Sequence, residues 1–287
     1  MAVVAALSSN RTVPVSVIVV AYNAGPALAD LVATLLPCCA QVIVVDNASQ
    51  DGCTEGLVDG PGTLVVLRNE QNRGFAVAVN QALDRVTQNW TLVLNPDCRV
   101  ECEVLQRLAQ RMTESPCAAA GVRVMNEDGS EQRASRRNLP RFGTLVREVL
   151  GLPGGVNLTG RPGTTENVEA VSGAFVWLRT EVFRALGGMD AGYFLHCEDL
   201  DLFARLKAAG HCVEWHGDLS VVHGKGQAGC DRKTVERHKH EGMLRYFDRH
   251  MAAEWPRGLK GAARWFIRLH GLWTRTKLRM GWSGVRR

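Results

Sequence analysis

The sequence lacks the long apolar segment that would cross a membrane. No window of about 18 residues is apolar throughout and free of charge. The apolar residues 2–7 have no basic region before them, and Asn10 and Arg11 end the run, which is unlike a secretory signal peptide. We therefore expect a cytoplasmic protein without a transmembrane helix.

Cysteine occurs nine times, an odd number, but no two cysteines form a C-x-x-C pair. Cys38 and Cys39 are adjacent, and Cys98 and Cys102 are four apart at the start of an expected helix. This spacing is unlike that of a zinc site or a disulfide framework. We expect reduced thiols.

Two nucleotide-binding fingerprints are also missing. No G-x-G-x-x-G follows the first expected strand, and no Walker A sequence is present, which argues against a dinucleotide-binding dehydrogenase and a P-loop enzyme. The turn at residues 22–25 is Tyr-Asn-Ala-Gly, unlike the glycine-rich basic loop expected of a sugar-nucleotide pyrophosphorylase.

What is present is ordinary for a soluble enzyme. The 287 residues are 46% hydrophobic and 22% charged, enough for one large domain, or for a core with an appendage. The net charge of +5 is unevenly spread, because residues 231–287 hold 15 Lys and Arg against 5 Asp and Glu. The positive charge therefore belongs to the tail.

Apolar β-forming runs alternate with helical patterns in the first hundred residues. This order predicts an α/β fold with a mostly parallel, doubly wound sheet. Runs with strand character are found at residues 15–21, 42–45, 64–67, 91–94, 121–125, 171–178, 212–215 and 219–222.

Three of the early strands end in polar clusters, at the sheet edge where such folds bind ligands. Asp46 could accept a hydrogen bond from a base or ribose, or cap the following turn. Arg73 and Gly74 precede a helix, which suits an anion or a plain helix entrance. Asp97, in Asn95-Pro96-Asp97, is either a site carboxylate or a turn residue.

The second half offers further candidates. Trp177 could stack on a sugar or lie in the core. Glu198 and Asp199 fall at the start of a helix, where the dipole alone would favour them. His223, beside glycines after a strand, is a candidate metal ligand, although a lone His is often not one. The stretch 151–165 could be a loop over the site or a linker.

Together these stretches resemble the family 2 glycosyltransferases, inverting enzymes of the GT-A fold. The resemblance extends over residues 14–226 and is greatest to the rhamnosyltransferase-like branch, which builds O-antigen and related cell-surface polysaccharides. The matching stretches are VSVIVVAYN, VIVVDNASQDG, NEQNRGFAVAVN, TLVLNPD, VSGAFVWLR and GGMDAGYFLHCEDLDLFARLKAAG, with the later His223.

The resemblance implies a nucleotide site and a metal. Asn95-Pro96-Asp97 keeps only the last carboxylate of the family's D-x-D motif. Asp97 would bind Mg²⁺ or Mn²⁺, and His223 would be a second ligand that favours Mn²⁺. The residues implied around the nucleotide are Tyr22, Asn23, Asp46, Arg73, Gly74, Asn95 and Asp97.

The resemblance also implies the catalytic and acceptor residues. Asp199 would be the general base, with Glu198 orienting it or the acceptor, and Gly173, Ala174 and Trp177 would lie beside the acceptor. The donor it favours is dTDP-L-rhamnose. The implied acceptor is a saccharide or a polyprenyl-linked saccharide.

We divide the chain into a GT-A domain (1–230) and a basic, Trp-rich helical extension (231–287). Within the domain, residues 14–100 would bind the nucleotide sugar and residues 101–230 the acceptor. Residues 257–279 could lie on an anionic membrane at the inner face of the cytoplasmic membrane. A protein partner or a solvated face are alternatives, and no base-reading motif supports nucleic-acid binding.

Three rival functions remain open at this point. A transferase of the same fold could use a UDP-sugar. A catalytically silent nucleotide-sugar binder or scaffold would have the same site residues. A nucleotidyltransferase or metal-dependent phosphohydrolase would share nucleotide and metal, but not the Glu198-Asp199 loop.

Overall fold

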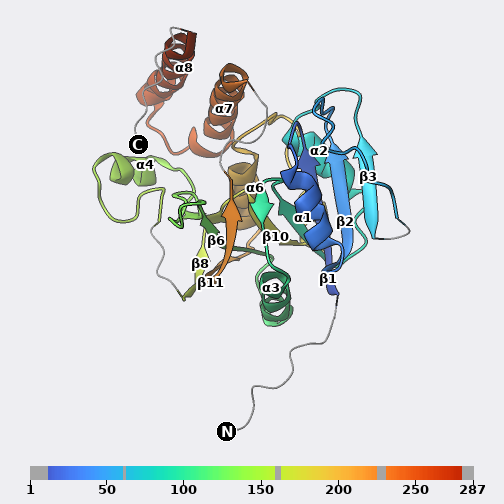
Figure 1. Cartoon of the computed structure of the whole chain (residues 1–287). Helices are drawn as coiled ribbons and strands as arrows, with labels where there is room; N and C mark the ends of the chain where they lie inside the picture. Colours follow the sequence, from blue (N-terminus) through green and yellow to red (C-terminus); the bar gives the residue numbers. More distant parts are fainter. Residues whose placement is uncertain (1–11, 61–62, 159–162, 225–230, 280–287) are drawn as a thin grey trace.

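The computed structural model describes residues 12–60, 63–158, 163–224 and 231–279. Its elements follow one another along the chain as shown in Figure 1. They are β1 (Val13–Ala21), α1 (Ala27–Leu35), β2 (Cys39–Asp46), β3 (Leu64–Arg68), α2 (Phe75–Leu83), β4 (Trp90–Leu94), β5 (Cys98–Arg99), α3 (Cys102–Glu114), β6 (Ala119–Met125), β7 (Arg136–Arg137), α4 (Phe142–Val149), β8 (Thr165–Val168), β9 (Ala170–Val171), β10 (Phe175–Arg179), α5 (Thr180–Ala185), α6 (Glu198–Ala208), β11 (Val213–His223), α7 (Arg232–Tyr246), η1 (Phe247–Met251, a π-helix) and α8 (Arg257–Arg279).

The main sheet has the strand order β3-β2-β1-β4-β10-β6-β11-β5, with β8 paired to β11. Strands β1 to β4 are parallel, whereas β10 is antiparallel to both β4 and β6, and β11 runs parallel to β6. The predicted mostly parallel sheet is confirmed. The antiparallel strand β10 separates the parallel strands β1 to β4 from β6 and β11.

Both faces of the sheet are covered, which explains why β1 is apolar at nearly every position. Val15, Val17 and Val19 belong to one core cluster, which contains buried residues of α1 and α3. Ile18 and Val20 belong to a second cluster, with buried residues of α2, α5 and α6. The sheet is therefore doubly wound, as predicted.

Two strand predictions need correction. The expected strands 212–215 and 219–222 form one strand, β11, whose pairing with β6 shifts between His216 and Ser220. A Cβ at Gly217 would lie 2.4 Å from the Trp215 ring, so glycine permits this irregularity. The expected strand 171–178 is interrupted by a turn, in which the Phe175 amide donates to Ser172 O at 3.2 Å.

The expectation that the cysteines are reduced thiols is wrong for four of them. Cys38 is joined to Cys102, and Cys117 to Cys212, as disulfides with Cα–Cα distances of 5.6 and 4.8 Å. The partners are 64 and 95 residues apart. Cys102 begins α3 and Cys38 precedes β2, whereas Cys117 and Cys212 precede the paired strands β6 and β11. Both disulfides thus depend on tertiary packing and leave no local pattern in the sequence.

Helix α7 is not a separate tail but packs on the segment between α5 and α6. Arg245 donates to both carboxylate oxygens of Asp190 at 2.8–2.9 Å. His238 stacks on Phe194 with ring centroids 4.1 Å apart. In η1, His250 Nε2 lies 2.7 Å from Asp201 Oδ1, and Asp201 also pairs with Arg205 at 2.7 Å.

In the part of the chain that the structure describes, no helix is both long enough and apolar enough to span a membrane. The 23-residue α8 has the length, but its cationic side chains keep its mean hydropathy low.

The contact between α7 and the segment before α6 is so close that it requires glycine. A Cβ at Gly242 would lie 2.5 Å from the backbone oxygen of His196. We expect Gly242→Ala to lower the stability of the protein by about 1–3 kcal/mol, because backbone must move to admit the methyl group. Urea-induced unfolding followed by tryptophan fluorescence measures the change.

The matched control is Gly261→Ala in α8, where a Cβ meets nothing within 4 Å. That substitution should leave stability unchanged or raise it, since alanine favours helix more than glycine does. Equal unfolding midpoints for the two variants would show that the α7 contact is not tight.

Candidate functional site

The polar clusters after β1, β2 and β4 lie side by side, because these strands are neighbours and run parallel. The first two loops are tied together by hydrogen bonds. The Asn23 amide donates to Ser49 Oγ at 3.0 Å, and Gln50 N donates to Asn23 Oδ1 at 2.7 Å. Gly25 N donates to Asp51 at 2.8 Å. Tyr22, next to Asn23 in the first of these loops, is partly exposed.

Asp46 is largely engaged by its own turn. Its Oδ1 accepts from Ser49 N at 2.8 Å, and its Oδ2 accepts from the Thr54 hydroxyl at 2.5 Å. The side chain is buried. Asp46 therefore caps its own turn in this structure. A contact of Asp46 with a nucleotide stays a prediction.

The neighbouring Asn47 organises the next loop, although the sequence analysis did not select it. Its Oδ1 accepts from Arg73 N at 3.0 Å, and its Nδ2 donates to Asn72 Oδ1 at 2.8 Å. Asn47 is only 2% exposed. An amide both donates and accepts, so it can hold two strand ends together where a carboxylate could not.

Arg73 and Gly74 stand at the start of α2. Gly74 has φ of 85°, and a Cβ there would lie 2.9 Å from Phe194, so glycine is required for the approach of a distant segment. The Phe75 amide donates to Phe194 O at 2.8 Å. Arg73 is exposed, and no ion pair involves its side chain among the described residues.

Asp97 and His223 lie together, as the sequence analysis expected. Strand β5 pairs with the end of β11, with Cys98 opposite His223. His223 Nε2 is 3.1 Å from Asp97 Oδ1 and 3.1 Å from Asn95 Nδ2. Both side chains are mostly buried, with 17% and 15% of their surface exposed.

Gln132, which the sequence analysis missed, orients His223. Its Nε2 donates to His223 O at 3.0 Å, so its Oε1, 3.2 Å from His223 Nδ1, is the acceptor there. Nδ1 therefore donates to Gln132, and Nε2 is the ring nitrogen that faces Asp97 and Asn95. Nε2 and the Asp97 oxygen, 3.1 Å apart, are the two atoms that could bind a cation here.

Asp97, Cys98 and His223 have potential ligand atoms within 4.8 Å of one another. The Cys98 thiol is 2% exposed and points to Ala174 O. The residues that fit a divalent cation are thus one carboxylate and one imidazole, with further positions left for ligand or water oxygens.

Residues 173 and 174 connect this cluster to the carboxylate pair. The Asn95 amide donates to Ala174 O at 3.0 Å, and a Cβ at Gly173 would lie 3.0 Å from Asp199 Oδ2. Asp97 and Asp199 are therefore linked through two adjacent residues. Glycine at 173 admits the Asp199 carboxylate.

Glu198 and Asp199 begin α6, as predicted, but have different surroundings. Burial, reinforced by the charge of Asp199, raises the pKa of Glu198 to about 8. Its Oε2 has no hydrogen-bond partner among the described residues. Asp199 instead receives a hydrogen bond from Arg137 at 2.5 Å, and Arg137 also donates to Val171 O at 3.1 Å.

Arg137 was missed because it lies 62 residues before its partner, in a basic run without a distinguishing pattern. Trp177 was misassigned. It is fully buried, with its ring 6.2 Å from that of Trp90. A ring without exposed surface cannot stack on a sugar, so the expected contact of Trp177 with the acceptor is wrong.

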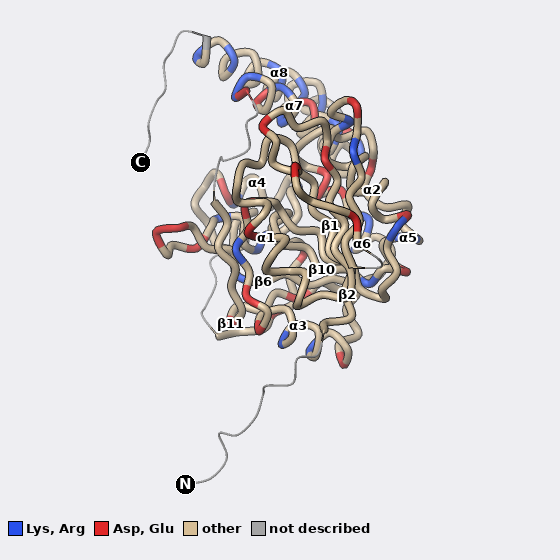
Figure 2. The backbone as a smooth tube through the Cα atoms, turned by 45° about the vertical axis from the view of Figure 1, so that its right-hand side comes forward, with Lys and Arg blue, Asp and Glu red and all other residues tan. Residues whose placement is uncertain are grey.

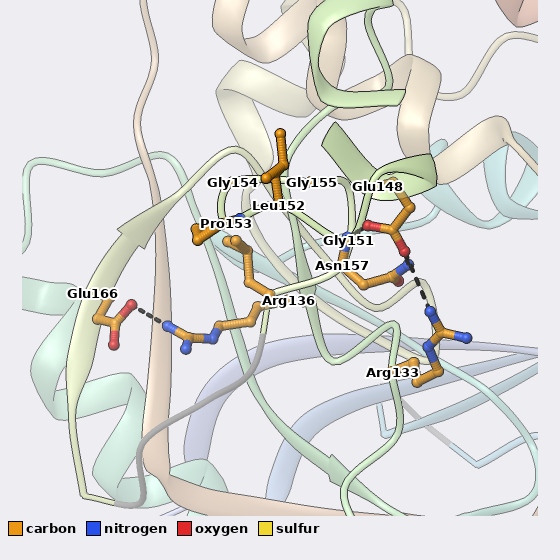
Figure 3. A pocket seen from close by; sticks show the side chains of 11 residues that line it. Arg133, Arg136, Glu148, Gly151, Leu152, Pro153, Gly154, Gly155, Asn157 and Glu166 are labelled. Atoms are coloured by element: carbon orange, nitrogen blue, oxygen red, sulfur yellow. Dashed lines mark hydrogen bonds and ion pairs between the residues drawn. The ribbon is translucent and has the colours of Figure 1, made fainter. Parts of the chain in front are cut away.

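A cavity of about 540 Å³ lies apart from these residues, and no predicted site residue lines it. Figure 3 shows its charged side chains paired with one another, Arg133 with Glu148 at 3.2 Å and Arg136 with Glu166. Residues 151–155, from the stretch 151–165 that could be a loop over the site or a linker, line it. The placement of that loop over the site stays a prediction.

Comparison with known proteins finds similar sequences and similar folds. A curated relative from Mycobacterium tuberculosis, N-acetylglucosaminyl-diphospho-decaprenol L-rhamnosyltransferase, is 27% identical over 238 residues, 74% of this chain and 76% of that protein. The name of this relative specifies its activity, the transfer of L-rhamnose.

Two solved structures have a similar fold. The mannosyltransferase PcManGT from Pyrobaculum calidifontis, in complex with GDP-Man and Mn²⁺, has a TM-score of 0.56 and 16% identity, and the match covers 93% of this chain and 73% of that one. GalNAc-T7 with UDP, GalNAc and Mn²⁺ has a TM-score of 0.59 and 15% identity, with 82% of this chain and 48% of that chain covered.

The sequence also matches a protein family as a whole. The sequence model of glycosyl transferase family 2 matches residues 16–187, more than half of the chain. The fold, a mixed and mostly parallel α/β sheet with C-terminal helices, is similar to that of these solved structures, which are GT-A glycosyltransferases. The chain therefore belongs to glycosyl transferase family 2.

Proposed function

We infer that the protein is a metal-dependent, inverting glycosyltransferase. It moves a sugar from a nucleoside-diphosphate donor to a saccharide or lipid-linked saccharide acceptor during synthesis of a cell-surface polysaccharide. The observation that carries this proposal is the continuous arrangement of Asp97 and His223, then Gly173 and Ala174, then Asp199. It joins a cation site to a carboxylate.

Asp97 and His223 would hold Mn²⁺ or Mg²⁺, and the imidazole ligand favours Mn²⁺. When bound, the cation would offset the negative charge that develops on the leaving diphosphate. Arg73 adds a second cationic group, exposed at the start of α2. Gly74, at the N-terminus of α2, would lie close to the diphosphate.

Tyr22, Asn23 and Asp46 would surround the base and ribose, with Asn95 beside the diphosphate. The hydrogen bonds between the two loops hold these residues in place before a ligand arrives. Asn47 does the same for Arg73. Preorganised loops lose less conformational entropy on binding.

Glu198 and Asp199 would have different roles. Asp199, paired with Arg137, would take the proton of the acceptor hydroxyl as it attacks the anomeric carbon. Glu198, protonated near neutral pH, would donate a hydrogen bond that orients the acceptor. A single in-line displacement inverts the anomeric centre and needs no covalent nucleophile.

The donor we favour is dTDP-L-rhamnose. The name of the Mycobacterium relative states that it transfers L-rhamnose to a lipid-linked N-acetylglucosaminyl diphosphate, and the sequence resembles the rhamnosyltransferase-like branch. A UDP-sugar is the alternative donor. A polyprenyl-linked saccharide is the acceptor class that agrees with the same relative.

Titration calorimetry with dTDP and UDP, each with and without Mn²⁺, tests the nucleotide and metal site together. We expect one nucleotide to bind in a metal-dependent way, Asp97→Ala to abolish that dependence, and His223→Ala to weaken binding at least about tenfold. His211→Ala, at the opposite end of β11, should bind as the wild type does.

If neither nucleotide binds, the proposed function is wrong. If Asp97→Ala retains metal-dependent binding, the site is wrong although the function could stand. Binding of a nucleotide sugar without transfer to any acceptor would instead indicate a catalytically silent binder.

The raised pKa of Glu198 predicts how stability depends on pH. Folded Glu198 keeps its proton up to about pH 8, whereas in the unfolded chain it loses the proton near the ordinary value of 4.5. The folded state thus binds more protons in this interval, so its contribution to stability falls as pH rises through it. Glu198→Gln should remove this dependence.

The measurement is the free energy of unfolding of wild type and Glu198→Gln across that pH range. The wild type should lose stability relative to the variant from pH 4.5 to about 8 and run parallel to it above. Glu103→Gln, whose carboxylate is 73% exposed, is the control. Parallel curves for wild type and Glu198→Gln would contradict a buried, protonated Glu198.

A further inference from the structure

Helix α8 has one face on the protein. Ala263 is buried and Ile267 packs against a cluster that includes Tyr246 and Phe247. At Gly271 a Cβ would lie 2.9 Å from the ring of His240 in α7. These positions are spaced four apart, so they form a single stripe along the helix. Arg264 adds an ion pair with Asp248 at 2.7 Å.

A second face of α8 is apolar and exposed. At 100° per residue its members fall within an arc of roughly 140°, turned away from α7. We call this set the α8 stripe: Leu259 (47% exposed), Trp265 (64%), Phe266 (71%), Leu269 (47%), Leu272 (54%) and Trp273 (55%). Six large apolar side chains on one exposed face are unusual for a surface that contacts only water.

The third face is cationic. Residues 257–279 include seven Lys and Arg and no Asp or Glu. Arg264, Arg268 and Arg275 lie along the arc next to the α8 stripe, and Lys277 covers the Trp273 ring at 3.7 Å. In the described ranges, Lys260 and Arg268 make no ion pair. Figure 2 shows the blue segments of Lys and Arg following one another along α7 and α8.

The position of α8 is coupled to the carboxylate pair through α7. His240 Nε2 and His270 Nδ1 lie 2.9 Å apart between the two helices. On its other side α7 contacts Phe194 and His196, just before Glu198. Figure 1 shows α7 and α8 on the side of the sheet toward which β11 runs, the side where His223 lies.

We propose that the α8 stripe binds the surface of an anionic lipid bilayer. Apolar side chains with Trp and Phe would enter the interface while the adjacent cations contact lipid phosphates. A second copy of the chain is disfavoured, because pairing two stripes would bring together two helices that each carry seven cationic residues and no anionic one.

This inference rests on the proposed function and deepens it, because membrane binding through α8 would hold the site against the bilayer that contains a lipid-linked acceptor. The binding itself needs neither donor nor acceptor. The two proposals can therefore fail separately.

The test is co-sedimentation of the full chain with vesicles of phosphatidylcholine alone or mixed with phosphatidylglycerol. We expect binding to the mixed vesicles that weakens as salt is raised. The combined variant Trp265→Ser, Phe266→Ser and Trp273→Ser should bind at least about tenfold more weakly. The matched control is Val58→Ser with Val149→Ser, which removes apolar side chains that are 77% and 84% exposed elsewhere.

Both variants should bind nucleotide in the presence of Mn²⁺ as wild type does, which shows that they are folded. The proposal is overturned if wild type stays unbound to mixed vesicles at low salt, or if the stripe variant binds as tightly as wild type. It is also overturned if lipid-free wild type is a dimer by light scattering and the stripe variant a monomer. Vesicle binding without nucleotide binding would refute the transferase alone.

Discussion

The hydrogen bond from the Asn95 amide to Ala174 O, 3.0 Å long, joins the two halves of the site. It exists because β10 lies antiparallel beside β4, so the end of one strand meets the beginning of the other. Through it the residues of Asn95-Pro96-Asp97 adjoin Gly173, and through Gly173 they adjoin Asp199. A parallel strand at that place would carry residues 173–174 to the opposite edge.

The segment before α6 is held in a conformation that its residues do not favour. His196 and Cys197 have φ of 71° and 70°, values that cost about 1–3 kcal/mol each in residues with a Cβ. Contacts on both sides offset this cost. The Phe75 amide binds Phe194 O, and α7 packs on His196 and pairs with Asp190. The segment is therefore positioned by the start of α2 and by the C-terminal helices together.

Site residues could be predicted from the sequence where they come at the end of a buried strand. Asp97 and His223 were both selected by that rule, and the structure brings them within 3.1 Å. Gln132 and Arg137 were not, because their partners lie 91 and 62 residues away. The predicted contact of Trp177 with the acceptor was wrong for a related reason, because the exposure of this side chain depends on which segments cover the sheet.

The sequence by itself determined the doubly wound sheet, the polar strand ends and the cationic apolar character of α8. These follow from local patterns: runs of β-branched residues, the turns that end them, and helical spacing of side chains. Only the tertiary structure decided the disulfides, the role of α7 as a support and the pairing of Asp199 with Arg137. Each of these depends on which distant segments the strand order makes neighbours, and local periodicity contains no information about that order.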